Sequence, residues 1–113
     1  AVFESGRGGI ALVDLRGGLM RVNHPFSECF SPNPRSTEGL SLLDLLDESD
    51  REAVAKELEM LSLGDHSRFE AARRFLNRDG EMFWAHTTSV LIRNENGEAD
   101  HLLILLDPVK GES

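Results

Sequence analysis

The side chains that could carry out chemistry are few and scattered along the chain. The sequence has one cysteine, Cys29, and four histidines at positions 24, 66, 86 and 101. A catalytic or metal site needs several such groups brought together. There is no Ser/His/Asp or Cys/His arrangement, no phosphate-binding glycine loop and no zinc-ligand spacing. We therefore expect neither an enzyme active site nor a metal centre, and we interpret Cys29 as a buried or half-buried side chain.

Three consecutive β-strands are predicted in the second half of the chain, over residues 67–76, 81–93 and 99–107. Asp79-Gly80 and Asn96-Gly97 separate them, and such pairs favour hairpins because they adopt positive φ at little cost. The last strand contains an unbroken apolar run, 102–106, which is typical of a strand covered on both faces. A buried helix is the alternative for this run, but its length and the preceding Asn-Gly favour a strand.

Two short strands and several helices are predicted in the first half. The strands cover 10–15 and 19–23, and the last turn of a helix is placed at 1–5. A short helix from Pro25 to about Phe30, a proline-rich loop over 31–37, a leucine-rich helical turn over 40–46 and a longer helix over 50–63 follow. Ser49 and Glu52 have capping-box spacing for the longer helix. The predicted fold class is α+β, a five-stranded antiparallel sheet with helices on one face.

Composition limits the classes of partner. The 113 residues fit one domain, and the formal net charge of −8 would repel a nucleic-acid backbone. A single cysteine fits a reducing compartment, and no apolar run is long enough to cross a membrane. We expect a cytoplasmic location, and the start without Met suggests one module of a longer protein.

The order and spacing of these motifs resemble those of a PAS domain with its C-terminal PAC portion, over 9–107. The resemblance rests on the opening Gly9-Ile10-Ala11-Leu12-Val13-Asp14, Asn23 after the second strand, the helix after Glu48-Ser49-Asp50, Arg78-Asp79-Gly80 before Trp84, and Asn96-Gly97 before the last strand. It implies one PAS-like domain over 1–113, with its core at about 9–107 and linker remnants at 1–8 and 108–113.

The family implies a sheet that senses a ligand or relays a signal within a larger bacterial-type regulator. Its last strand often ends in Asp-x-Thr, which couples the sheet to the output helix. Here Asp107 is the expected coupling residue, but Val109 replaces the Thr, and Pro108 tends to end the strand.

The resemblance also bears on cofactors, and we expect neither flavin nor haem. Flavin-binding relatives of the light-oxygen-voltage type carry a reactive Cys near the short helix, whereas residues 39–43 contain none and Cys29 comes too early. Haem-binding relatives use a His on the longer helix, and 50–63 contains none. His66 lies beyond Gly64 in a loop. The identity of any cofactor stays open.

The resemblance places Trp84 on the sheet face away from the helices, and the alternation of side chains then assigns both faces. His86 and His101 fall on opposite faces, so they do not form a metal pair. The helix-facing wall is expected to line a ligand cavity and consists of Arg73, Phe75, Ala85, Thr87, Ser89, His101, Leu103 and Leu105. The opposite face is expected to form an interface and consists of Trp84, Val90, Leu102, Ile104 and Leu106.

Arg73 has two possible roles. An inward guanidinium could bind a small carboxylate or phosphate, with hydrogen bonds from Thr87, Ser89 or His101. Alternatively it pairs with a nearby Asp or Glu, which is the interpretation we favour. The acidic residues Asp44, Asp47, Glu48 and Asp50 are expected to stabilise a helix N-terminus.

The sequence therefore predicts a non-catalytic sensory or signal-relay module of a larger signalling protein, of the histidine kinase, diguanylate cyclase or chemoreceptor type. Its expected partners are a second copy, bound through the outer face, and an output domain in the same polypeptide, without nucleic acid or membrane contact. The alternative is a ligand-free dimerisation module whose core is filled by Leu42, Leu43, Leu45, Leu46, Phe75 and Leu105.

Overall fold

The computed structural model of the chain describes residues 8–30 and 37–109. The predicted helical turn at 1–5 and nearly all of the predicted loop at 31–37 lie outside these residues. Five strands form one antiparallel sheet in the order β2-β1-β5-β4-β3. The strands are β1 (Gly9–Val13), β2 (Leu19–Val22), β3 (Arg68–Leu76), β4 (Met82–Arg93) and β5 (Ala99–Pro108).

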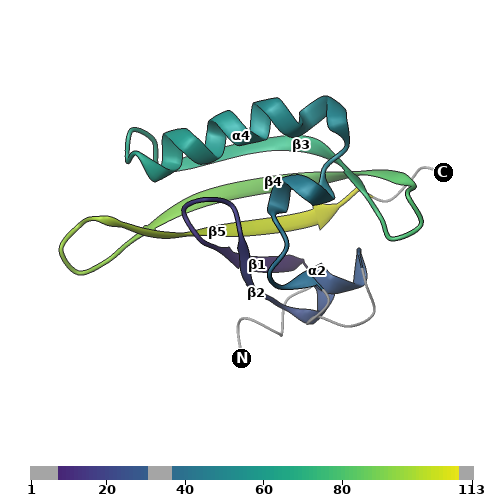
Figure 1. The fold of residues 1–113 in the computed structure, drawn as a ribbon, viewed down its shortest axis with the longest axis horizontal. Helices are drawn as coiled ribbons and strands as arrows, with labels where there is room; N and C mark the ends of the chain where they lie inside the picture. The colour runs from purple at the N-terminus through teal and green to yellow at the C-terminus, as the bar shows by residue number, and fades with distance from the viewer. Residues whose placement is uncertain (1–7, 31–36, 110–113) are drawn as a thin grey trace.

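In the described residues, three helices accompany the sheet: α2 (His24–Glu28), the 3-10 helix η1 (Leu42–Leu45) and α4 (Glu48–Ser62). Figure 1 shows α4 running along one face of the long β3–β4–β5 half, with α2 beside the short strands β1 and β2. We call the face that α4 covers the inner face and the opposite one the outer face. The predicted α+β class, with a five-stranded antiparallel sheet, is confirmed.

The two long hairpins close through the same local device. Asn77 accepts hydrogen bonds from the backbone N–H groups of Asp79 and Glu81, and Asn94 does the same for Asn96 and Glu98. A glycine at positive φ completes each turn, Gly80 in the first and Gly97 in the second. These turns are local in sequence, which is why the Asp-Gly and Asn-Gly pairs predicted them.

The start of α4 differs from the prediction. The N-cap is Asp47, whose carboxylate accepts a hydrogen bond from the Ser49 backbone N–H at 3.0 Å, so Ser49 lies inside the helix. The predicted Ser49–Glu52 capping box is therefore wrong. The physical reason is tertiary: the Asp47 backbone N–H donates to the Arg74 carbonyl at 2.9 Å, which fixes Asp47 against β3 as the residue that caps the helix.

One segment, the connector (residues 37–47), is hydrogen bonded to both edges of the sheet. At the β2 edge, Leu19 donates to the Leu40 carbonyl at 2.8 Å and accepts from the Gly39 N–H at 2.7 Å. At the β3 edge, Leu46 forms an isolated bridge with Phe75, next to the Asp47–Arg74 bond. The connector therefore crosses the inner face from one edge of the sheet to the other.

The pairing of β5 corrects the predicted faces. Thr87, Ser89 and Leu91 lie opposite Leu106, Ile104 and Leu102, and direct partners share a face. These three β5 side chains are at most 1% exposed, so their prediction as outer-face interface residues is wrong. The prediction that His101, Leu103 and Leu105 face the helices is wrong for the same reason, because they lie on the outer face.

The wrong face assignment of β5 has one cause, an irregularity in the β4–β5 hairpin. Arg93 pairs with Ala99, and a regular ladder from that pair would set Ser89 opposite Leu103, which would give the predicted faces. A register shift between Ile92 and Arg93 sets Ser89 opposite Ile104 instead. A shift of one residue moves every side chain of a strand to the other face. Because residues 102–106 are all apolar, hydrophobicity gives no signal of the shift.

Candidate functional site

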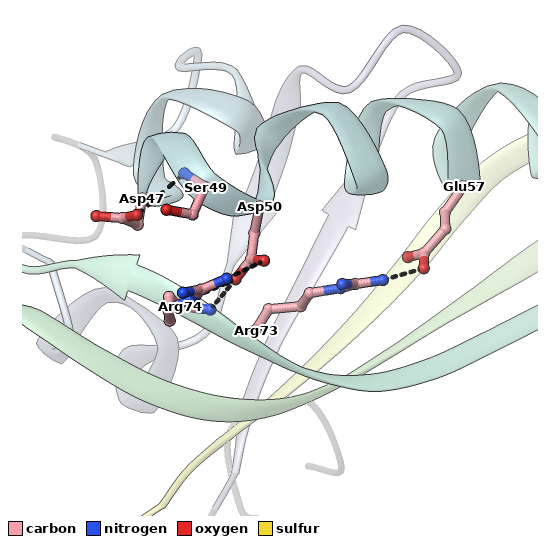
Figure 2. A network of polar contacts seen from close by, with 6 residues as sticks. All are labelled: Asp47, Ser49, Asp50, Glu57, Arg73 and Arg74. Atoms are coloured by element: carbon pink, nitrogen blue, oxygen red, sulfur yellow. Dashed lines mark hydrogen bonds and ion pairs between the residues drawn. The ribbon is translucent and has the colours of Figure 1, made fainter.

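Arg73 lies under α4, and its partner is a carboxylate of that helix. Its guanidinium donates to Glu57 Oε2, and both side chains are less than one-fifth exposed. Figure 2 shows Arg73 reaching from β3 to Glu57 on α4. The favoured interpretation of Arg73 as a paired residue is confirmed. Its Nε is buried and has no hydrogen-bond partner among the described residues.

The inner face around Arg73 is filled by the chain's own side chains. Phe75, a predicted ligand-binding residue, packs in an aromatic cluster with Phe30 and Phe83, at ring-centroid distances of 5.7–6.0 Å. Thr87 is buried and its hydroxyl donates to the Ala85 carbonyl at 3.2 Å. The other inner-face residues predicted for a ligand, Ala85 and Ser89, are also buried.

Several leucines of the connector complete this packing. Leu42, Leu45 and Leu46 are buried in the core, and Leu43 packs against it. Leu105 was also predicted to fill the core, but it is 38% exposed on the outer face. The described part of the inner face is therefore a packed core, with Arg73 as its ionic contact to α4.

Arg74, the neighbour of Arg73, makes a second ion pair that the sequence did not predict. Its Nε and a terminal guanidinium nitrogen donate to the two carboxylate oxygens of Asp50 at 3.1 and 3.0 Å, and its backbone N–H donates to Asp50 at 2.7 Å. Asp50 is only 6% exposed. The hydrogen bonds from Arg74 hold the pKa of Asp50 below its ordinary value, although burial opposes this shift.

Arg74 also touches the outer face. Arg74 and Trp84 are direct partners across β3 and β4, and the guanidinium carbon lies 5.0 Å from the Trp84 ring centroid. The side chain of Arg74 therefore contacts both an outer-face tryptophan and the start of α4. Figure 2 shows the second contact, with Asp50. Asp50 was predicted only as part of an acidic helix N-terminus, because nothing local in the sequence connects it to position 74.

The outer face is open and carries several exposed apolar side chains. Trp84 is 43% and Leu105 is 38% exposed. Half-buried apolar residues surround them on the same face, namely Ile10, Leu12, Val90 and Leu103. The outward placement of Trp84 and Val90 agrees with the prediction, and His101 lies here too, 2.6 Å from Asp100 Oδ2.

A depression of about 860 Å³ opens at one end of the outer face. Ile10 and Leu105 contribute apolar walls, and Cys29, at the end of α2, contributes another. Cys29 is half-buried, as predicted, and burial together with the nearby Glu28 raises the pKa of its thiol to about 11. Asp107, the predicted coupling residue, is exposed at the rim, and its role in coupling stays a prediction.

Within residues 8–30 and 37–109, no three His, Cys, Asp or Glu side chains converge on a point where they could hold a metal ion. In the same residues no helix is long and apolar enough to cross a membrane.

Comparisons with known proteins agree with this architecture. Residues 19–105 match the family model described as "PAS fold". A probable diguanylate cyclase, DgcE, of Escherichia coli (strain K12) is 22% identical over 101 residues, which are 89% of this chain and 9% of that protein. The chain thus spans less than a tenth of the length of this curated relative.

Two solved structures have the same fold. The PAS domain of a Colwellia psychrerythraea protein has a TM-score of 0.85 and 19% identity, over 96% of this chain and 91% of that one. A domain of the sensory box sensor histidine kinase/response regulator from Geobacter sulfurreducens has a TM-score of 0.77 and 18% identity, over 94% and 87%.

Proposed function

The chain belongs to the PAS fold family of sensory domains, and from this premise we propose that it relays a signal through contacts of its outer sheet face with a second copy of itself. In this proposal the inner face is a structural core rather than a ligand chamber. The resulting dimer transmits a change in the relative position of its two copies to an output domain of the same polypeptide.

The single observation that supports this proposal is the contrast between the two faces. Three inner-face residues of β5, Leu102, Ile104 and Leu106, are at most 1% exposed. On the outer face, Trp84 and Leu105 are more than one-third exposed and lie among other apolar residues. Exposed large apolar side chains that gather on one face in this way indicate an interaction site. A second copy is the simplest partner, because a two-fold dimer uses the same patch on both subunits.

The signalling context is supported by the relatives. One is a probable diguanylate cyclase, and one structural neighbour comes from a sensor histidine kinase/response regulator. We propose an output domain of one of these kinds, or of the chemoreceptor kind, in the full-length protein. The chemistry then belongs to that output domain, and this module has no catalytic role of its own.

A small anionic ligand at Arg73 is the second candidate function. It is favoured by one observation, the buried Arg73 Nε that has no partner among the described residues. Such a ligand would bind the guanidinium beside Glu57 and would alter the contact between β3 and α4. It would act as the signal that the outer face then relays.

The test is sedimentation velocity combined with native mass spectrometry of the purified chain. We expect a dimer without a co-purified ligand. Leu105→Glu should give a monomer, because it places a charge in the apolar outer face. Leu63→Glu is the matched control, since Leu63 is 68% exposed at the end of α4 and lies off this face.

Two outcomes would contradict parts of this proposal. A dimer that survives Leu105→Glu, or a chain that is monomeric at high concentration, would exclude the outer-face interface. A bound small-molecule mass that is lost in Arg73→Gln would instead support the ligand-sensing function.

A further inference from the structure

Three ionisable side chains form a row across the outer face, one on each of the three long strands. We call Glu70 on β3, His86 on β4 and Asp107 on β5 the outer row. His86 Nε2 lies 2.7 Å from Glu70 Oε2. On its other side His86 is the direct partner of Asp107 in the β4–β5 ladder. The imidazole of His86 therefore contacts one carboxylate directly, and a second carboxylate-bearing residue lies beside it across the ladder.

The outer row borders the apolar surface of the proposed interface. His86 and Asp107 both line the depression, together with Ile10 and Leu105. Trp84 lies two positions before His86 on the same face of β4. A partner that covers Trp84 and Leu105 would therefore also remove the outer row from water.

The charge state of His86 determines the free-energy cost of burying the outer row in the interface. With a neutral imidazole, the row brings two carboxylates into the interface, and only Glu70 has a cation beside it, Arg68 at 3.4 Å. Burying the uncompensated charge of Asp107 is strongly unfavourable. A protonated imidazole adds a cation next to both residues. The carboxylate of Glu70 already responds to its neighbour: its pKa is lowered, first by the hydrogen bond with His86 and then by Arg68.

We propose that protonation of His86 controls docking at the outer face, so that the dimer forms more tightly as the pH falls. This inference rests on the proposed function, since it names the regulation of the same interface. Histidine suits the task because its charge changes between about pH 5 and 8. The sign follows from linkage: if the dimer favours the charged imidazole, dimerisation takes up protons, and its affinity rises on acidification.

Most of the other charged groups near His86 are already engaged. On β3, Arg68 contacts Glu70 at 3.4 Å, and Arg74 is bound to Asp50. On α2, at the far wall of the depression, Glu28 is paired with His24 at 2.9 Å. The exception is on β5, where the carboxylate of Asp107 has no hydrogen bond or ion pair with any other described residue. The described residues of β1 contribute no charged side chain here.

Acidification also brings the net charge of −8 closer to zero, and the weaker repulsion between copies would favour self-association at any surface. The proposal differs from this general effect because it requires one imidazole. His101 is the matched control: it lies on the outer face beside a carboxylate, 2.6 Å from Asp100, but outside the outer row.

The experiment measures the dimer dissociation constant by sedimentation between pH 5.5 and 8 at constant ionic strength. For the unaltered chain we expect binding about tenfold tighter at pH 5.5 than at pH 8. His86→Gln should abolish most of this dependence, whereas His101→Gln should keep it. Glu70→Gln combined with Asp107→Asn should tighten the dimer at pH 8, because it removes the two carboxylates.

Two further measurements keep the outcomes distinct. Circular dichroism at both pH values verifies that each variant is folded, and the emission of Trp84, the only tryptophan, reports coverage of the outer face. A dimer that Leu105→Glu disrupts but whose affinity does not change with pH, or changes equally in His86→Gln, overturns this inference and leaves the proposed function intact. A chain that is monomeric throughout the range overturns both.

Discussion

The two faces of the sheet are built from the same strands, yet they differ in how their side chains find partners. On the inner face, Ile104 is fully buried and Arg73 is paired with Glu57. One position along the same strand, Leu105 is 38% exposed on the outer face. The apolar character of a strand therefore does not tell which of its faces the chain covers. Strand pairing decides that, and the uncovered apolar face is the one left for a partner.

The difference between the two faces predicts the largest effect when the same charge is placed on each face of β5. Ile104→Glu should abolish folding or cost more than about 4 kcal/mol, because it buries a carboxylate in the core. Leu105→Glu should change the free energy of unfolding by about 1 kcal/mol or less. Urea denaturation followed by circular dichroism measures both. Equal losses in the two variants would mean that the faces are not distinct.

The ion pair at the start of α4 has the next largest expected effect. Asp50→Asn should lower the free energy of unfolding by about 2–3 kcal/mol at pH 7, because it leaves Arg74 without its buried carboxylate. Asp44→Asn is the matched control on an exposed acidic residue of η1 and should leave stability unchanged.

The variant Asp50→Asn should also change how the free energy of unfolding depends on pH. The pKa of Asp50 is lowered in the folded protein, so its contribution is present above the ordinary Asp pKa of about 3.9 and is lost as pH falls through the lower folded value. Stability curves of the unaltered chain and Asp50→Asn should therefore converge below about pH 4. Curves that stay parallel down to acid pH would contradict the assignment.

The contact between α2 and β1 should give a smaller effect. A Cβ at Gly9 would lie 2.8 Å from Phe26 Cα, so Gly9→Ala must push α2 away from the strand. We expect a loss of about 1–3 kcal/mol in thermal or urea unfolding. Gly8→Ala is the matched control, since its nearest contact is an ordinary 3.4 Å to the Leu106 carbonyl. An unchanged stability of Gly9→Ala would disprove the close approach.

The smallest perturbation is a chemical label on Cys29 at the outer depression. Its thiol has a pKa of about 11, so at pH 7.5 the folded chain should react with iodoacetamide at least about a hundredfold more slowly than the urea-unfolded chain. The rate should rise about tenfold per pH unit up to that pKa. Mass spectrometry follows the reaction, and equal rates for the folded and unfolded chains would contradict the half-buried position.

The parts of the fold that the sequence predicted are those fixed by local rules. The turns at Asn77–Gly80 and Asn94–Gly97 follow from asparagine side chains and glycines within a few residues. The strands and α4 follow from apolar patterning, with shifts of one or two residues at their ends. The kind of partner that Arg73 has was also predicted, although Glu57 was not identified.

The parts that were missed depend on contacts between residues distant in sequence or on the one-residue shift in the β4–β5 register. The register of β5 is set by the irregularity at Ile92 and Arg93, which no composition rule locates. The pair of Asp50 and Arg74 joins residues 24 positions apart. From the sequence, His86 and Asp107 were considered separately. They were not placed opposite each other, because their pairing depends on the same register of β5.

The connector has a consequence for aggregation. A free edge strand offers unpaired N–H and C=O groups to strands of other chains, and proteins protect such edges by covering them. Here residues 39–41 bond to the β2 edge, and residues 46–47 bond to the β3 edge near Arg74. At these places growth of the sheet by strand addition is blocked. Mutations that detach the connector should therefore promote fibril-like assembly, a different product from the face-to-face dimer.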